Sequence, residues 1–188
     1  MKITIQKQWE IRTADGKVKR TRKKRCNSYV LAFLDLLRTI MTGTASVSTL
    51  DTSNTARNVS QSTNNLGTWG IVGDINYGPV VGTGSTAVAL ADYKLVTRIA
   101  HGVGAGQLQY AATTFTAAVT SGTTRRFTII RSFTNSSGAS ITINETGIYC
   151  MGGSTPWYFC AERALESPGV AIANGATGTL TYTISITV

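Results

Sequence analysis

The single histidine, His101, is the residue on which most hydrolytic chemistry in this chain would depend. Any Ser-His-Asp or Cys-His arrangement would have to use it as the base, because the sequence holds no other imidazole. No Gly-x-Ser-x-Gly elbow or cysteine-containing signature accompanies it, and it stands in the glycine-rich segment 101–106. We therefore expect His101 to make a structural hydrogen bond, and we expect the chain to have no catalytic residues.

Patterns for binding a metal or a phosphate are also incomplete. The three cysteines, Cys26, Cys150 and Cys160, form no CxxC pair, and one histidine with scattered thiols does not provide zinc-ligand spacing. The segment Gly82–Gly84 looks like part of a phosphate loop but lacks the Gly-Lys-Ser/Thr ending, so a turn between strands explains it better. The prediction is a protein that is not an enzyme and that carries no metal or cofactor.

Positive charge is concentrated near the N-terminus, where the chain has its strongest candidate for binding a partner. Residues 1–38 hold eleven of the 18 Lys/Arg and three of the nine Asp/Glu. We expect an electrostatic docking site at seven cations in nine residues: Lys17, Lys19, Arg20, Arg22, Lys23, Lys24 and Arg25. Such a run can neutralise phosphates of a nucleic acid without reading its sequence, although no aromatic residue is interleaved for stacking on bases. An acidic protein surface would account for it equally well.

The element that carries these cations is predicted from alternation. Residues 2–12 place Ile3, Ile5, Trp9 and Ile11 on one face, which is typical of a half-buried strand; only Lys7 intrudes on that face. Turn residues at 15–16 then favour a hairpin. In the returning strand the cations would fall on both faces, so we expect either an exposed edge or a segment that becomes ordered against an acidic partner.

One amphipathic helix is predicted over 29–41. Asn27 or Ser28 can cap its first turn, and Gly43 ends it. A helix this apolar must pack on something, either the end of its own β body or a neighbouring subunit. Its expected contact stripe consists of Val30, Phe33, Leu34, Leu37 and Met41.

The rest of the chain is predicted to be a β body. Residues 44–67 are mostly small and polar, and we expect an extended Ser/Thr/Asn-rich loop. From 68 to 188 short strands and turns follow one another, including a short buried strand at 69–73, which favours an antiparallel sandwich. The predicted fold class is mainly β: a jelly-roll-like antiparallel β-sandwich (68–188) preceded by a basic β-hairpin arm and one apolar α-helix (1–43).

The low proportion of charged residues favours a protein whose surface is covered by other subunits in an assembly. Charged residues make up 14% of the chain, against about 25% in ordinary soluble domains. A body with so little charge resists self-association weakly, so we expect a homo-oligomer or a larger assembly. The odd number of cysteines favours free thiols in a reducing compartment. No signal-peptide core and no apolar run of about 20 residues is present, so we expect a cytoplasmic product with no membrane partner.

Several stretches resemble short sequence motifs. Residues 81–88 followed by 92–95 are similar to a "GTGTTA…D.AL" signature, and 131–149 resembles "FTN.SG..ITV.EVGLY". Residues 161–188 are similar to "L.R…V.V.NG.TLTVTYTI", and 26–41 is similar to an "NSFV..FLDLL" helix. In this order, the stretches resemble virion structural proteins of tailed bacteriophages. Within these motifs, Glu145 is expected near a bend at Gly147, where it can accept backbone donors or a cation such as Arg163.

The resemblance implies a structural role in a virion that is assembled from subunits made in the host cytoplasm. The expected function is non-enzymatic: a capsid decoration, tail, adaptor or fibre-base subunit that binds copies of itself and other capsid or tail proteins. The basic arm would dock on an acidic shell or on packaged DNA. Two alternatives stay open, a nucleic-acid-binding module that uses the basic arm and a glycan-binding fibre head with Tyr77, Trp157 or Tyr158 at its rim.

Overall fold

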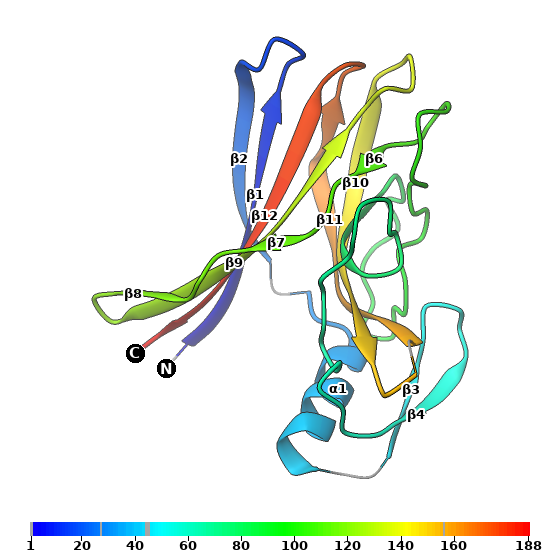
Figure 1. Ribbon diagram of the computed structural model, residues 1–188, viewed down its shortest axis with the longest axis vertical. Coiled ribbons are helices and arrows are strands. Elements are labelled where there is room, and N and C mark those ends of the chain that lie inside the picture. Colours follow the sequence, from blue (N-terminus) through cyan, green and yellow to red (C-terminus); the bar gives the residue numbers. More distant parts are fainter. Residues whose placement is uncertain (1, 27, 44–45, 156) are drawn as a thin grey trace.

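The computed structural model describes residues 2–26, 28–43, 46–155 and 157–188. Two antiparallel sheets pack face to face, and a small helical lobe closes one side of the pair (Figure 1). This confirms the predicted sandwich class with one helix in the described part of the chain. Lys2 pairs with Thr187, so the two ends of the chain lie side by side (Figure 1).

The large sheet has the strand order β2-β1-β12-β9-β6, and β7 and β8 also pair with β9. Its inner face carries the alternating apolar residues that the sequence pattern predicted, with Trp9 opposite Leu180 and Ile5 opposite Ile184. The strands are β1 (Lys2–Arg12), β2 (Val18–Cys26), β6 (Gln109–Tyr110), β7 (Thr114–Phe115), β8 (Val119–Ser121), β9 (Thr124–Thr134) and β12 (Thr177–Thr187).

The small sheet has the order β11-β10-β5 and covers the inner face of the large one. Its strands are β5 (Gly78–Gly82), β10 (Ile141–Gly152) and β11 (Trp157–Ile172). Ile143, Tyr149 and Val170 from this sheet share one continuous core with Phe133 and Tyr182 from the large sheet. Burial of that apolar layer is the main force holding the two sheets together.

The basic hairpin forms, but the structure does not confirm a separate arm. Strand β1 pairs with β2 on one side and with β12 over its whole length on the other, so the hairpin belongs to the large sheet. The turn at Gly16 has a positive φ of 81°, which the predicted turn residues supply. Strand β1 also places its apolar side chains in the shared core.

The single helix, α1 (Leu31–Thr42), differs from the prediction in its start and in the face that it buries. Its N-cap position is Val30, which makes no side-chain cap bond; Asn27 lies outside the described residues. Gly43 ends the helix with φ 60°, as predicted. The buried face consists of Ala32, Leu36 and Thr39. Ala32 and Leu36 pack into a second small core with Val59, Cys150 and Phe159.

The segment expected to be an extended loop is partly a hairpin, β3 (Val47–Leu50) and β4 (Ala56–Val59). Asp51 organises its turn by accepting the backbone N–H groups of Ser53 and Thr55 at 2.8 and 3.0 Å and Arg57 Nε at 2.7 Å. Asn65 then donates to Thr39 Oγ1 at 2.6 Å. Short polar side chains fold this segment by bonding locally, which a pattern of apolar residues cannot reveal.

Candidate interaction site

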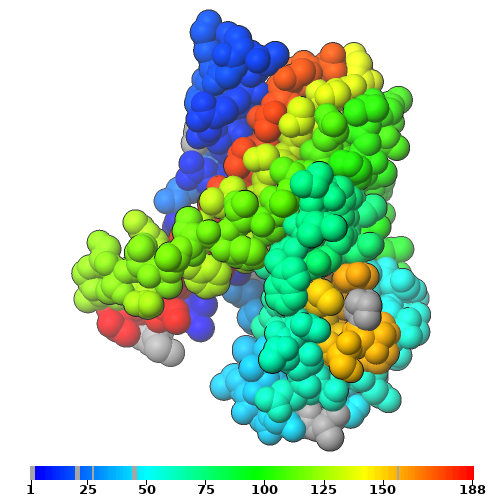
Figure 2. All heavy atoms as spheres, viewed as in Figure 1, coloured from blue at the N-terminus to red at the C-terminus, as the bar shows by residue number. Residues whose placement is uncertain are grey.

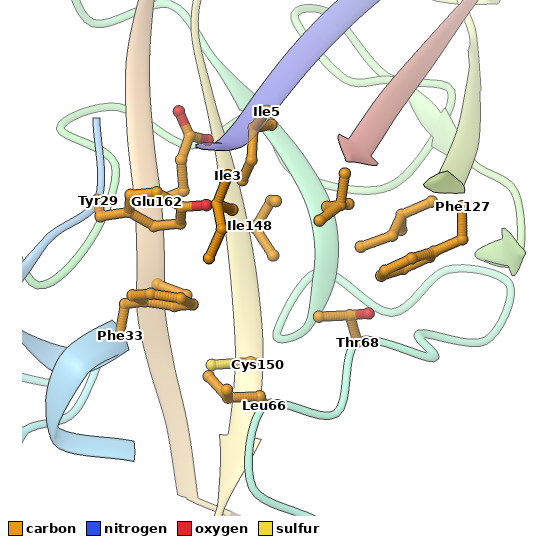
Figure 3. A pocket seen from close by; sticks show the side chains of 13 residues that line it. Ile3, Ile5, Tyr29, Phe33, Leu66, Thr68, Phe127, Ile148, Cys150 and Glu162 are labelled. Atoms are coloured by element: carbon orange, nitrogen blue, oxygen red, sulfur yellow. The ribbon is translucent and has the colours of Figure 1, made fainter. Parts of the chain in front are cut away.

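The two sheets diverge at the end where both chain termini lie, and an apolar groove opens between them. We call this region the open end (Figure 1). The groove holds about 210 Å³. The large sheet, the small sheet and the segment around α1 all contribute its lining: Ile3, Ile5, Tyr29, Phe33, Leu66, Thr68, Phe127, Ile129, Ile148, Cys150, Ala161, Glu162 and Ile184 (Figure 3).

Glu162 carries the only carboxyl group in that lining, and this group bonds to two residues that do not line the groove. Its carboxylate accepts the Tyr182 hydroxyl at 3.1 Å and the Cys26 thiol at 2.5 Å. Burial raises the pKa of Glu162, against the opposing effects of nearby Lys7 and of these two bonds. Because Glu162 is only 1% exposed, the groove presents a largely apolar surface.

The exposed side of α1 extends this apolar surface beyond the groove. Tyr29 and Phe33 stack with ring centroids 4.2 Å apart and line the groove, so Phe33 belongs to both surfaces. Leu34 is 61% exposed and Met41 is 76% exposed, although both were expected to make helix contacts. In space-filling view, a notch separates the projecting β8–β9 hairpin from the lobe that contains α1 (Figure 2).

The predicted helix stripe is thus divided. Val30 is buried in the main core, and Phe33 and Leu37 are half-buried. Leu34 and Met41 face solvent because the face that α1 turns toward the body carries Ala32, Leu36 and Thr39. Of the two partners expected for the stripe, the body accounts for Val30, whereas Leu34 and Met41 are left for contact with a neighbouring subunit.

The predicted docking cations are divided between the two faces of β2. The register pairs Lys23 with Gln8 and Arg25 with Gln6, so these two exposed cations share the outer face of the large sheet. Lys17 is exposed and lies 3.0 Å from Asp15, and Lys19 is exposed near the turn. Arg20 pairs through its backbone with Ile11. The predicted exposed edge strand is confirmed.

The two remaining cations of the run, Arg22 and Lys24, form hydrogen bonds within the chain. Arg22 donates to the backbone carbonyls of Ser167 and Pro168, and Lys24 Nζ donates to the Leu165 carbonyl at 3.1 Å. Both side chains therefore reach from β2 to β11, across the side of the sandwich. They are committed to contacts within the chain and do not belong to a free docking surface.

Lys7, the charge on the apolar face of β1, lies in the core with a carboxylate. Its Nζ is 2.7 Å from Glu166 Oε1 and donates to Thr146 Oγ1 at 2.8 Å; Trp9 Nε1 also donates to Glu166 at 3.1 Å. The Lys7 and Glu166 side chains are each 1% exposed. Sequence reasoning noticed Lys7 but missed its partner, which comes from a strand more than 150 residues away along the chain.

The motifs behind the virion resemblance converge on a second buried ion cluster. Arg163 Nε lies 2.9 Å from Glu145, and its Nη1 lies 2.8 Å from Asp92. Glu145 also accepts the backbone N–H groups of Gly84, Val96 and Thr97 at 2.8 to 3.2 Å. Residues from the three separate motifs thus tie the segment 83–97 to the small sheet. The expectation that Glu145 accepts backbone donors and Arg163 is confirmed.

Arg131 is a buried residue that sequence reasoning did not single out. It shares a strand face with Phe133 and is 1% exposed, and its guanidinium donates only to backbone carbonyls, including Ile71 at 3.0 Å and Tyr77 at 3.0 Å. Burial lowers the pKa of Arg131. The segment 69–73 is not the buried strand that was predicted: it lies outside the strands, Ile71 and Val72 are exposed, and the Ile71 carbonyl accepts from this guanidinium.

The histidine and the cysteines, which were considered for catalysis or metal binding, lie in structural environments. His101 Nδ1 accepts the backbone N–H of Tyr110 at 3.0 Å, as expected of a structural histidine. Cys26, Cys150 and Cys160 are buried free thiols, and burial raises the pKa of Cys150 to about 12. Among the described residues, no group of three or more His, Cys, Asp or Glu side chains has the arrangement of a metal site.

The aromatic residues proposed for a glycan rim pack mainly on other side chains. Tyr77 stacks on Tyr158 with centroids 5.6 Å apart, and Trp69 meets Tyr77 edge-on at 6.2 Å. The Arg57 guanidinium lies 5.3 Å from the centre of the Trp157 ring. The Tyr77–Tyr158 stack and the Arg57 contact each cover one face of rings that a bound sugar would use.

Comparisons with known proteins found no matching family model, no matching curated protein and no matching solved structure. In the described ranges, α1 is too short to cross a membrane. Function is therefore inferred from the surfaces themselves.

Proposed function

We propose that this protein is a non-enzymatic structural subunit of a tailed-phage virion, and that it assembles with copies of itself through the open end. The observation that carries the proposal is the apolar groove together with exposed Leu34 and Met41 on α1, the helix whose Phe33 lines that groove. Monomeric proteins rarely leave contiguous apolar patches beyond a few hundred Å² exposed, and larger ones mark sites of association. The virion assignment rests on the ordered motifs of the resemblance.

A second copy can occupy the groove although the chain is positively charged. The net charge of +9 makes two copies repel each other. The groove lining adds nothing to this repulsion, because it contains no cation and its one carboxyl group is bonded to Tyr182 and Cys26. Two open ends can therefore meet and bury their apolar side chains against each other.

Sedimentation velocity of the purified chain over a wide concentration range tests this assembly. We expect a concentration-dependent oligomer, and we expect Leu34→Glu combined with Met41→Glu to weaken it at least about 100-fold. Burying carboxylates against apolar surface costs several kcal/mol, and about 2.7 kcal/mol corresponds to that factor.

The matched control is Val18→Glu combined with Val103→Glu, which also replaces two exposed apolar residues but away from the open end. This control should associate like the wild type. A wild-type chain that stays monomeric at every concentration, or an equal loss in both double variants, would contradict assembly through the open end.

The virion assignment needs a separate experiment. A gold-labelled tag inserted at the Asp15–Gly16 turn, which lies away from the open end, can be located by electron microscopy in lysates of the phage that encodes the chain. We expect the label at repeated positions on particles. A label found only in the unassembled fraction would overturn the virion role even if the purified chain forms oligomers.

A further inference from the structure

The outer face of the large sheet combines polar hydroxyls with unpaired positive charge. A shallow hollow on this face is lined by nine residues; seven are Thr, Ser or Gln, and the other two are Lys23 and Arg126. Lys23 stands on β2 and Arg126 on β9, on opposite sides of β1 and β12. With neighbouring strands about 4.8 Å apart, the two cations stand on strands separated by roughly 14 Å.

A third cation and a scarcity of acidic residues make this outer face positive. Arg25 pairs in register with Gln6, which lines the hollow, so its exposed guanidinium lies on the same face. Glu10 is the only acidic residue in the sequences of β1, β2, β8, β9 and β12, and its carboxylate is 2.7 Å from Arg12. Three cations, Lys23, Arg25 and Arg126, therefore remain for a polyanion.

The hydroxyls between these cations are held in fixed positions. Thr4 bonds to Ser185 at 2.8 Å, and Thr124 bonds to Thr187 at 2.9 Å, in each case across neighbouring strands. Each hydroxyl uses one donor or one acceptor in such a pair and keeps further capacity for a ligand. Because β-branched threonines are stiff at χ1, little side-chain freedom is lost when a ligand binds.

The composition of the face favours a nucleic acid over an acidic protein. Protein–protein interfaces bury an apolar core, and the hollow contains no apolar side chain in its lining. Protein–DNA interfaces are more polar and far more positive, and most of their hydrogen bonds come from Arg, Lys, Ser, Thr, Asn and Gln to phosphate and sugar. The lining also has no aromatic residue on which unpaired bases could stack, which favours a duplex over a single strand.

We propose that the outer face of the large sheet binds the phosphate backbone of duplex nucleic acid without reading its sequence. The length of the face fits this ligand: β9 and β12 each run for 11 residues, about 37 Å, close to one helical turn of about 34–36 Å. The open end uses the inner face of the same sheet, so a subunit in an oligomer can keep this outer face free.

Fluorescence anisotropy with a labelled random-sequence duplex of about two helical turns tests the proposal. Three phosphate contacts, each contributing about 0.9 to the slope of log K against log salt, predict a roughly 40-fold loss of affinity between about 50 and 200 mM salt. In the variant Lys23→Gln/Arg126→Gln one contact remains, so we expect weaker binding and only a three- to fourfold loss over the same range.

The control variant Arg38→Gln/Lys94→Gln lowers the net charge equally but changes α1 and the segment 83–97 instead. It should bind like the wild type, whereas an equal loss in both variants would mean that only net charge matters and would overturn the proposal. Absence of wild-type binding at low salt would overturn it too. Arg25→Gln alone provides an independent variant if the double one does not fold.

Two competitors separate the nucleic-acid ligand from its alternatives. Unlabelled duplex should displace the probe at far lower charge concentration than polyglutamate or a single strand of the same length. Equal displacement by polyglutamate would instead identify an acidic protein as the partner, and equal displacement by the single strand would contradict the duplex. Sedimentation without nucleic acid measures self-association separately, so the failure of one proposal does not imply the failure of the other.

Discussion

Lys7 and Glu166 illustrate how single residues in this sandwich can carry charge without providing a reaction site. The pair lies in the core, where an ion is stable only with its counter-ion and its hydrogen bonds in place. Thr146 and Trp9 supply those bonds. Glu166 Oε2 makes no hydrogen bond of its own to the described residues, and Arg22 lies 3.8 Å from it. The Glu166 carboxylate therefore depends on Lys7 as its one close counter-ion.

Removing only the cation of this pair should be costly. We expect Lys7→Met to lower the free energy of unfolding by about 3–5 kcal/mol, because the Glu166 carboxylate would stay buried without its partner. Lys7→Met/Glu166→Gln should recover most of this loss, since a neutral amide oxygen can still accept the Trp9 N–H group. Chemical denaturation monitored by tryptophan fluorescence measures both values.

Gln8→Met is the matched control, because Gln8 lies on the outer face of the same strand. Its effect should stay within about 0.5 kcal/mol. If Lys7→Met costs less than about 1 kcal/mol, water or another group must solvate Glu166, and the description of a dry ion pair would be wrong.

At the scale of elements, the cations on one face of β2 bond to β11, and those on the other face are exposed. Arg22 and Lys24 reach the carbonyls of β11 and close one side of the sandwich. Lys23 and Arg25 stand on the outer face, with no carboxylate partner among the described residues. An edge strand with this many cations also resists pairing with a strand of another chain, which protects the sheet from aggregation.

Dividing the cations of β2 by face should separate folding from binding. We expect Arg22→Ser/Lys24→Ser to lower the free energy of unfolding by about 2–4 kcal/mol, because several charge-assisted hydrogen bonds are lost. Lys23→Ser/Arg25→Ser, with the same change in charge, should leave stability within about 0.5 kcal/mol but reduce duplex affinity. Denaturant unfolding and anisotropy on both variants provide the comparison, and equal destabilisation of the two would refute the division.

At the scale of the whole molecule, the surfaces proposed for the two kinds of partner are on opposite faces of one sheet. The groove of the open end is largely apolar and lined by no cation, and the outer face is polar and positive. Salt acts on binding at these two surfaces in opposite directions. It screens the repulsion between copies that each carry +9, which favours self-association. It also makes the release of counter-ions from a duplex less favourable, which weakens duplex binding.

Raising salt from about 50 to 200 mM should therefore strengthen self-association while it weakens duplex binding. Sedimentation velocity and anisotropy on the same preparation can follow both equilibria. If both weakened together, charge rather than apolar contact would be holding the copies together, and the open end would not be the assembly surface.

The sequence by itself determined the elements whose signal is local. Alternation located β1 and β12, the residues at 15–16 specified the hairpin turn, and Gly43 marked the end of α1. These predictions are confirmed because strand and turn preferences depend on side-chain period and backbone φ, both of which can be read from neighbouring residues. The expected contact between Glu145 and Arg163 is also confirmed.

Only the tertiary structure decided which side of each element meets the rest of the chain. The predicted stripe of α1 included Leu34 and Met41, yet the face that is buried carries Ala32, Leu36 and Thr39. Arg131 and Lys7 find their partners on distant strands, and the cations of β2 are separated by a register that β1 imposes. Such choices depend on contacts between residues far apart in the sequence, and a local pattern carries no information about them.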